Sequence, residues 1–429
     1  MAGNSNKLTH QPYKLRDAME PSASLELAKH ALLMFGIILA VGTFSGVIAR
    51  LVRIPDVVVF LLVGMLLGPG VLGWVNIKAD STVNQLILIF GSSYILFDGG
   101  ASIRLKVLKE VWITIVMIST VGVLVTAAIT GVAAYYFLGV VPIVALLLGA
   151  VIASTDPATL VPVFKQVRIK ERVAQTVMSE SAFNDAMGAI ITFTVLGVAI
   201  GAGEFSAGDA IIDLLKQSLL GILIGGALGY LAAFFIAHEK FGFLAEFAPV
   251  VTLMAVIGAY MGADGMHASG FMAVFVFGIM IGNQESLGFR LTQHEDNLLE
   301  DYVMTTAFIM RMFIFILLGT QVDFGLMNQY LFSGVAVVMV FMLIARPAAV
   351  FLCALPDRRA KWSFKEMLFM CWTRETGVIP GALAGMLLGM KAPGAQVIAS
   401  VTFIAILMTI LIQATTTKWL AKKLGLLVG

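Results

Sequence analysis

The sequence places a group of polar side chains inside a segment that otherwise has the composition of a membrane helix. The run Met178–Gly188 contains Glu180, Ser181, Asn184 and Asp185. A charged side chain at the centre of a bilayer costs at least about 2.5 kcal/mol, so a carboxylate there indicates a functional site. The chemistry open to such a group is to carry a proton or to bind a cation.

The spacing of these residues assigns them to two neighbouring faces of a helix. Ser181 and Asp185 are four residues apart, as are Glu180 and Asn184, so each pair shares a face. A carboxylate, a hydroxyl and released backbone carbonyls form the set of hard oxygen ligands that a small cation prefers. Because a buried carboxylate is costly without a counter-ion, a proton and a metal cation would compete for Asp185, and such competition is a mechanism of exchange. The structural alternative is that Asp185 is the buried partner of an arginine.

Two further apolar segments combine buried charge with residues that break helices. The fifth of the thirteen apolar segments of the chain (141–164) contains Thr155-Asp156-Pro157, where the proline lacks a backbone donor and disfavours helical geometry at Asp156. The twelfth segment (363–389) contains two charges, a glycine and a proline, namely Arg374, Glu375, Gly377 and Pro380. Paired interrupted helices at equivalent positions of two repeats point to a binding site at the membrane midplane. The alternative is that the prolines only kink two packed helices.

The remaining buried charges need partners or compensating dipoles. Glu180 and Arg346 are predicted to form an ion pair, because neither tolerates isolation in hydrocarbon. Arg311 also needs a partner, and Glu375 is the candidate.

At the two breaks, Asp156 would offset positive helix N-termini and Arg374 a negative C-terminus. Asp98, near the end of the third segment, either lies at the membrane surface or reaches the cation site. The position of Asp98 in the sequence does not distinguish a surface location from contact with the cation site.

Composition identifies the class of protein. The chain has 429 residues, of which 59% are hydrophobic and only 13% charged, whereas soluble domains carry about 25% charged residues. The fold class is therefore an all-α polytopic membrane protein. A polar tail (1–27) precedes a single transmembrane domain (28–423) and a short end (424–429). The thirteen apolar segments predicted to cross the membrane are 29–49, 56–75, 84–102, 110–137, 141–164, 171–201, 208–237, 245–263, 268–283, 297–320, 327–355, 363–389 and 394–417.

The distribution of basic residues predicts the topology. With alternating spans and a cytoplasmic C-terminus, eighteen loop lysines and arginines fall inside, and only Lys78 and Lys391 fall outside, a strong positive-inside bias. The N-terminus is then outside. The basic residues are spread among short loops, so no nucleic-acid partner is expected. Cys353 and Cys371 are expected to be buried hydrophobes, and neither a cofactor nor a resident metal is predicted.

Segments five and twelve are seven apart, which predicts two six-helix repeats (about 29–201 and 245–417) around a linking segment (208–237). In the linking segment, glycines recur every fourth residue at Gly221, Gly225 and Gly229. This spacing allows close approach of another helix, either within the chain or in a dimer.

The motifs resemble those of the monovalent cation/proton antiporters of the CPA1 branch, the NhaP-type sodium/proton exchangers related to animal NHE exchangers. The matching strings are Leu61–Pro69, Leu96–Gly100, Thr155–Pro157, Glu180–Asp185, Phe315–Gly319 and Ala345–Arg346. The resemblance implies a thirteen-helix homodimer with a dimerisation domain and a core domain that moves as an elevator, giving alternating access to one site per protomer.

The resemblance also implies roles for individual residues. Asp185 carries the proton or the cation, helped by Ser181 and the backbone around Thr155. Asn184 is a supporting residue associated with electroneutral exchange, and Glu180 with Arg346 is the buried ion pair. The transported cation is the only metal implied.

Two departures from the family pattern bear on this implication. Asp98 stands where the family usually has glutamate, and Thr373–Gly377 replaces a glycine-arginine-glycine string. Glu375 keeps potassium/proton exchange open beside sodium or lithium/proton exchange. A sodium-coupled organic anion carrier is the alternative from another class, and a hydrolytic enzyme is disfavoured because Pro157 adjoins Asp156 in the only acid pair.

Overall fold

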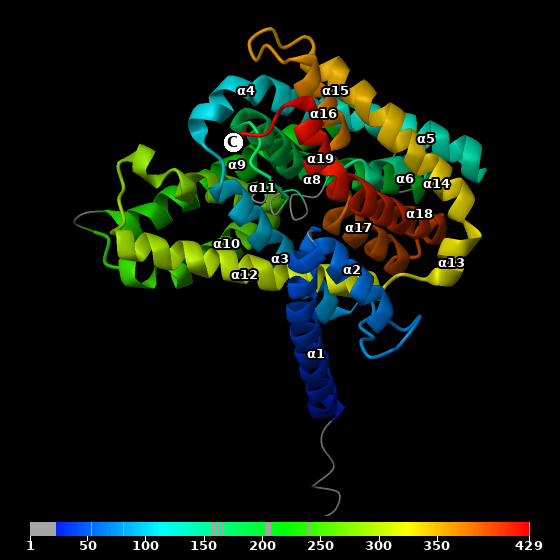
Figure 1. Ribbon diagram of the computed structural model, residues 1–429, viewed down its shortest axis with the longest axis horizontal. Coiled ribbons are helices and arrows are strands. Elements are labelled where there is room, and N and C mark those ends of the chain that lie inside the picture. Colours follow the sequence, from blue (N-terminus) through cyan, green and yellow to red (C-terminus); the bar gives the residue numbers. More distant parts are fainter. Residues whose placement is uncertain are drawn as a thin grey trace, which may run out of the picture.

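The chain folds almost entirely into helices, as the composition predicts (Figure 1). The computed structural model describes residues 23–52, 54–79, 81–155, 160, 163–164, 167–201, 207–238 and 241–428. Within these ranges the only β-pairing is an isolated bridge between Ile169 and Leu427. The fold class predicted from composition is confirmed.

The helices follow the predicted apolar segments closely. Their bounds are α1 (Ala23–Val52), α2 (Asp56–Leu67), α3 (Thr82–Ala101), α4 (Leu105–Met117), α5 (Val123–Leu138), α6 (Pro142–Ile152), α8 (Glu171–Ala199), α9 (Ala207–Ala237), α10 (Ala248–Gly265), α11 (Gly270–Gly282), α12 (Gln293–Thr320), α13 (Phe324–Gln329), α14 (Leu331–Val340), α15 (Arg346–Ala354), α16 (Phe364–Trp372), α17 (Val378–Gly389), α18 (Ala395–Met408) and α19 (Thr415–Leu424).

Eight helical stretches in the described ranges are long and apolar enough to cross a membrane, and four shorter helices are also apolar. Every predicted segment coincides with at least one helix. The protein is therefore a multi-pass membrane protein, while the figure of thirteen crossings stays a prediction. Most of the polar tail, residues 1–22, lies outside the described part of the chain.

The three largest apolar clusters of the described residues organise the interior. The first joins α1, α2, α12 and parts of α3 and α18, the second joins α3, α8, α9, α10 and α11, and the third joins α5, α6, α14, α17 and α18. In Figure 1, α10 and α12 lie towards the left, and α5, α14 and α18 towards the right. Helix α8 belongs to both sides, because Val173 and Val177 pack in the second cluster and Val195 and Leu196 in the third. The polar run of α8 lies between these two apolar ends.

The interruption predicted in the twelfth segment is present. Helix α16 begins with a capping box between Ser363 and Glu366 and ends at Trp372, and α17 begins at Val378. Residues 373–377 are not helical. In the fifth segment, α6 ends at Ile152, and the predicted break at Asp156 lies outside the described residues. The break in the twelfth segment therefore confirms the prediction, whereas the break at Asp156 stays a prediction.

Glycines in α9 allow α11 to approach closely. A Cβ at Gly221 or Gly225 would collide with backbone carbonyl oxygens of Ser269 and Ala273, and one at Gly229 would meet the Met280 side chain. Of the two uses predicted for this glycine spacing, the structure shows packing within the chain.

This packing predicts that Gly225→Leu lowers stability by about 1–3 kcal/mol, the usual cost of overpacking. The matched control is Gly226→Leu on the next residue, because a Cβ there has open space around it. Thermal unfolding of the detergent-solubilised variants measures the difference. Equal melting temperatures for the two variants would contradict the assignment of this glycine face to α11.

Candidate ion-binding site

The polar run of α8 is fully enclosed by protein. Glu180, Ser181, Asn184 and Asp185 are each at most 1% exposed. The helix also approaches the end of α6 closely, because a Cβ at Gly188 would lie 2.9 Å from the Cβ of Ser154. The run that sequence singles out is thus a buried polar layer beside the non-helical residues after α6.

Thr155 joins this layer through hydrogen bonds to two side chains of α8. Its backbone N–H donates to Asn184 Oδ1 at 2.9 Å, and its hydroxyl donates to Ser181 Oγ at 2.9 Å. Asn184 Nδ2 in turn donates to Thr155 Oγ1 at 2.7 Å. The side chains therefore fix the extended backbone at Thr155 against α8.

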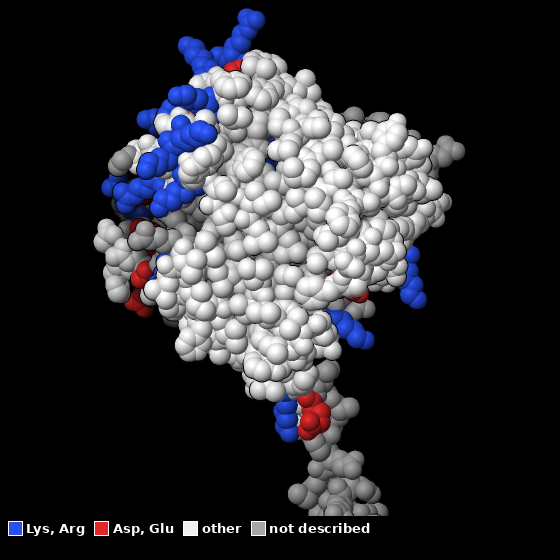
Figure 2. All heavy atoms as spheres, turned by 45° about the vertical axis from the view of Figure 1, so that its right-hand side comes forward, with Lys and Arg blue, Asp and Glu red and all other residues white. Residues whose placement is uncertain are grey.

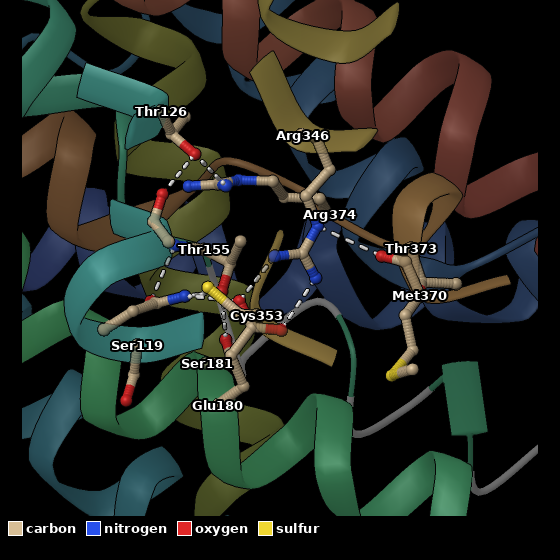
Figure 3. A network of polar contacts seen from close by, with 12 residues as sticks. Ser119, Thr126, Thr155, Glu180, Ser181, Arg346, Cys353, Met370, Thr373 and Arg374 are labelled. Carbon is tan, nitrogen blue, oxygen red and sulfur yellow. Dashed lines mark hydrogen bonds and ion pairs between the residues drawn. The ribbon is translucent and has the colours of Figure 1, made fainter. Parts of the chain in front are cut away.

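The ion pair predicted between Glu180 and Arg346 is present and bidentate (Figure 3). Arg346 Nη1 and Nη2 donate to the two carboxylate oxygens of Glu180 at 2.6 and 2.7 Å. The remaining Nε of Arg346 donates to the Met370 carbonyl at 3.0 Å, and both charged residues are at most 1% exposed. Arg346 is therefore the arginine that pairs with Glu180.

Asn184 connects the ion pair to Thr155. Its Nδ2 also donates to Glu180 Oε1, at 3.2 Å, so the amide bridges the carboxylate and the threonine hydroxyl. An aspartate at this position could not donate that bond and would face Glu180 with a second negative charge. The amide is therefore a requirement of the network formed by Arg346, Glu180, Asn184, Thr155 and Ser181.

Arg374 and Glu375 lie in the break between α16 and α17 and are 2% and 0% exposed. Arg374 Nη1 donates to Thr126 Oγ1 at 3.2 Å, and the guanidinium lies 5.0 Å from the centre of the Phe341 ring. The backbone N–H of Thr376 donates to Thr409 Oγ1 at 3.0 Å. The break is thus held by hydroxyls from α5 and from the π-helical turn η5 (Thr409–Ala414).

Three π-helical turns lie against this region. The turn η1 (Ile118–Gly122) provides the carbonyl that accepts from Thr126, η4 (Phe341–Ala345) directly precedes Arg346, and η5 contains Thr409. Such turns widen a helix by one residue and often occur at functional sites. Each turn here contains or closely precedes a residue that contacts either the ion pair or the break.

Asp185 lies on the face of α8 that Ser181 shares, one turn further along the helix, and is fully buried. Ser181 is held by the Thr155 hydroxyl, so a carboxylate and a fixed hydroxyl occupy one helix face. These two groups, together with the non-helical backbone at Thr155, form the candidate cation ligands. Asp156 lies outside the described residues.

Asp98 lines a cavity of about 640 Å³ between α3, α11 and α12 and is 6% exposed. A second cavity of about 540 Å³ shares Ser102 and Arg104 with the first and reaches α8 at Met178. Asp98 is therefore buried at the wall of the first cavity. Of these two cavities, only the second touches α8, at residues that precede Glu180.

The partner suggested for Arg311 was wrong. Arg311 Nη2 lies 3.9 Å from Asp56 Oδ2, so the pair joins α12 to the first residue of α2 instead of reaching Glu375. Sequence reasoning treated Asp56 as the end of an apolar segment and missed its role. It also missed Thr126 and Thr409, whose hydroxyls are ordinary in sequence and acquire a role only through the fold.

The bidentate pair predicts that Arg346→Ala destabilises the protein by about 3–5 kcal/mol, because it leaves a buried carboxylate without its partner. The double variant Glu180→Gln/Arg346→Gln removes both charges and should recover much of the loss. Expression level and thermal unfolding measure both effects. A stable but inactive Arg346→Ala variant would instead assign Arg346 to the transport site.

Known proteins resemble this chain over almost its whole length. The family model described as the transmembrane sodium/hydrogen exchanger matches residues 36–423. The Na(+)/H(+) antiporter 1 of Methanocaldococcus jannaschii is 31% identical over 421 residues, covering 91% of this chain and 94% of that protein. The K(+)/H(+) antiporter NhaP of Alkalimonas amylolytica is 29% identical over 408 residues, covering 94% of this chain and 68% of that protein.

A solved structure shares the fold. The sodium proton antiporter MjNhaP1 from Methanocaldococcus jannaschii, solved at pH 8, superposes with a TM-score of 0.76 at 30% identity. The match covers 93% of this chain and 99% of that one. These matches confirm the resemblance noted from the sequence motifs, and the chain belongs to the sodium/hydrogen exchanger family.

Proposed function

We propose that this protein exchanges a monovalent cation, sodium first and lithium with it, for protons across the membrane. The observation that carries the proposal is a fully buried aspartate, Asp185, one helical turn from a hydroxyl fixed by Thr155. Membership of a transporter family agrees with it. The cation is substrate, and the proposal includes neither a resident metal nor a cofactor.

Competition for Asp185 is the proposed mechanism. When Asp185 is ionised, its carboxylate, Ser181 Oγ and the backbone at Thr155 offer oxygen ligands to a dehydrated cation. When Asp185 is protonated, the site is neutral and needs no cation. An empty ionised site is costly to bury. The site therefore switches its access from one side of the membrane to the other only when it holds a proton or a cation.

Charge balance supports one-for-one, electroneutral exchange. Glu180 is neutralised by Arg346 through two short hydrogen bonds, and the residue beside Asp185 is the neutral Asn184. A proton and one monovalent cation carry the same charge, so replacing one by the other at Asp185 moves no net charge across the membrane.

Potassium/proton exchange is the second candidate. One relative is named a K(+)/H(+) antiporter, and Glu375 adds a buried carboxylate to the break beside Arg374. Sodium is placed first because the relative named a Na(+)/H(+) antiporter is covered over 94% of its length. An organic anion carrier would need Arg374 directed at its substrate, whereas Arg374 Nη1 donates to Thr126 Oγ1 and its guanidinium lies against the Phe341 ring.

The proposal includes the assembly and the orientation. We propose a homodimer in the cell membrane, with a dimerisation domain and a moving core, the C-terminus cytoplasmic and the N-terminus outside. Figure 2 supports the orientation, because lysines and arginines gather mainly at the upper left of the face shown, while the middle of that face is broadly white. Anionic lipid of the cytoplasmic leaflet favours that basic region.

We expect Asp185→Asn to abolish exchange and to leave the melting temperature within a few degrees of the wild type, because the amide keeps the shape but cannot carry a proton. The measurement is collapse of a pH gradient in proteoliposomes on addition of sodium, lithium or potassium in turn. Appreciable exchange by this variant would remove Asp185 from the centre of the mechanism. A requirement for an organic anion would favour the carrier.

We expect Ser181→Ala to raise the apparent KM for the cation about tenfold, since a lost hydrogen-bonding hydroxyl is worth roughly 1–1.5 kcal/mol. Ser179→Ala is the matched control. Ser179 is also buried in α8, but it lies neither on the helix face that Ser181 shares with Asp185 nor on the face that Glu180 shares with Asn184. Initial rates at a series of sodium concentrations give both values. The same KM for the two variants would exclude the Ser181 hydroxyl from the ligand set.

A further inference from the structure

A cavity of about 670 Å³ lies apart from the polar layer of α8. One wall is formed by α1, α2 and α12, and the other by α19 and the residues Val163 and Val167. Ile410, in the turn η5 that runs directly into α19, packs in the same apolar cluster as the helices of the first wall. The cavity therefore lies beside an existing apolar contact between its two walls.

The charged residues that line this cavity are mainly basic. Arg50 ends α1, Arg311 lies in the middle of α12, Lys418 lies in α19, and Asp56 is the single acidic residue lining the cavity among the described residues. This excess of positive charge repels a cation, so the cavity is not suited to be a path for the transported ion. It suits an anion instead.

Arg311 is the buried end of this basic group. It is 9% exposed, and within the described chain its Nε has no hydrogen-bond partner. Its contact with Asp56 is long, at 3.9 Å, and its guanidinium lies 5.8 Å from the centre of the Phe308 ring. A guanidinium held in this way has donors left for an oxyanion, and its planar fork matches phosphate geometry.

Most of the remaining lining is apolar and includes Ala49, Ile54, Val163, Val167 and Phe308, beside the two threonines Thr305 and Thr415. A cavity that is basic at one end and apolar along its walls matches a molecule with an anionic head and a hydrocarbon chain. Arg50 and Lys418 are exposed, so the head group can be reached from the surface of the molecule.

We propose that this cavity binds an anionic phospholipid, with the phosphate between Arg311, Arg50 and Lys418 and an acyl chain along the apolar wall. The bound lipid contacts α1 and α12 on one side and α19 on the other. The proposal goes beyond cation exchange and does not depend on which cation is transported.

The test is lipid binding to the full-length protein, measured by native mass spectrometry with phosphatidylglycerol and, for comparison, phosphatidylcholine. Lys418→Gln and Arg50→Gln should each weaken phosphatidylglycerol binding about fivefold, the usual worth of one basic residue at an anionic lipid surface, and should leave the weaker phosphatidylcholine binding unchanged. Lys422→Gln is the matched control, because Lys422 is also an exposed lysine of α19 but does not line the cavity.

Two results would overturn the proposal. One is phosphatidylglycerol binding by Lys418→Gln and Arg50→Gln that equals the wild type, and the other is an equal loss in Lys422→Gln, which would indicate a general surface effect. Inorganic phosphate and glycerophosphoglycerol, which lack acyl chains, should compete poorly; competition as strong as that of the lipid would assign the cavity to free phosphate.

Failure of this proposal is distinguishable from failure of the proposed function. Lipid binding is measured without an ion gradient, so Asp185→Asn should bind phosphatidylglycerol like the wild type. The melting temperatures of Lys418→Gln and Arg50→Gln check that both variants are folded. Lipid binding by Arg311→Gln is interpreted only together with the results for these two variants, because this substitution also removes the ion-pair partner of Asp56.

Discussion

The site depends on the bidentate ion pair between Glu180 and Arg346. Two opposite charges at this depth are tolerable only together, and the pair places Arg346, from α15, against the middle of α8. The amide of Asn184 transmits this constraint to Thr155, whose hydroxyl fixes Ser181. A single connected network therefore orients the polar groups beside Asp185 and removes one acid from the charge balance.

The second constraint is backbone that is not helical. The residues between α16 and α17 and those after α6 leave backbone groups without intrahelical partners, which is tolerated in a membrane only where protein encloses them. Between α16 and α17, threonine hydroxyls from neighbouring helices provide hydrogen-bond partners. Thr409 Oγ1 accepts from the backbone N–H of Thr376, and Thr126 Oγ1 accepts from the guanidinium of Arg374. A π turn contains or closely precedes each of these threonines, as is common at functional sites.

Much of this arrangement was predictable because burying charge is expensive. The pair between Glu180 and Arg346 follows from the need of each for a partner, and the break before α17 follows from glycine and proline next to two charges. The partner of Arg311 was not predictable, because Asp56 reads as the polar start of a helix and only packing brings α2 to α12.

Other features leave no pattern in the sequence at all. A π turn adds one residue to a helix without changing composition or hydropathy, so the turn before Arg346 could not be foreseen. The cavity beside Asp98 arises from the spacing of three helices, and hydroxyl partners such as Thr126 resemble any other threonine of an apolar helix.

The central claim is that a proton and a cation exclude each other at Asp185. Proton release on cation binding, recorded with a pH indicator in weakly buffered, detergent-solubilised protein, tests it most directly. Below the pH at which Asp185 ionises, addition of sodium should release one proton for each ion bound, and the release should vanish at high pH. Sodium binding at low pH without proton release would contradict the account.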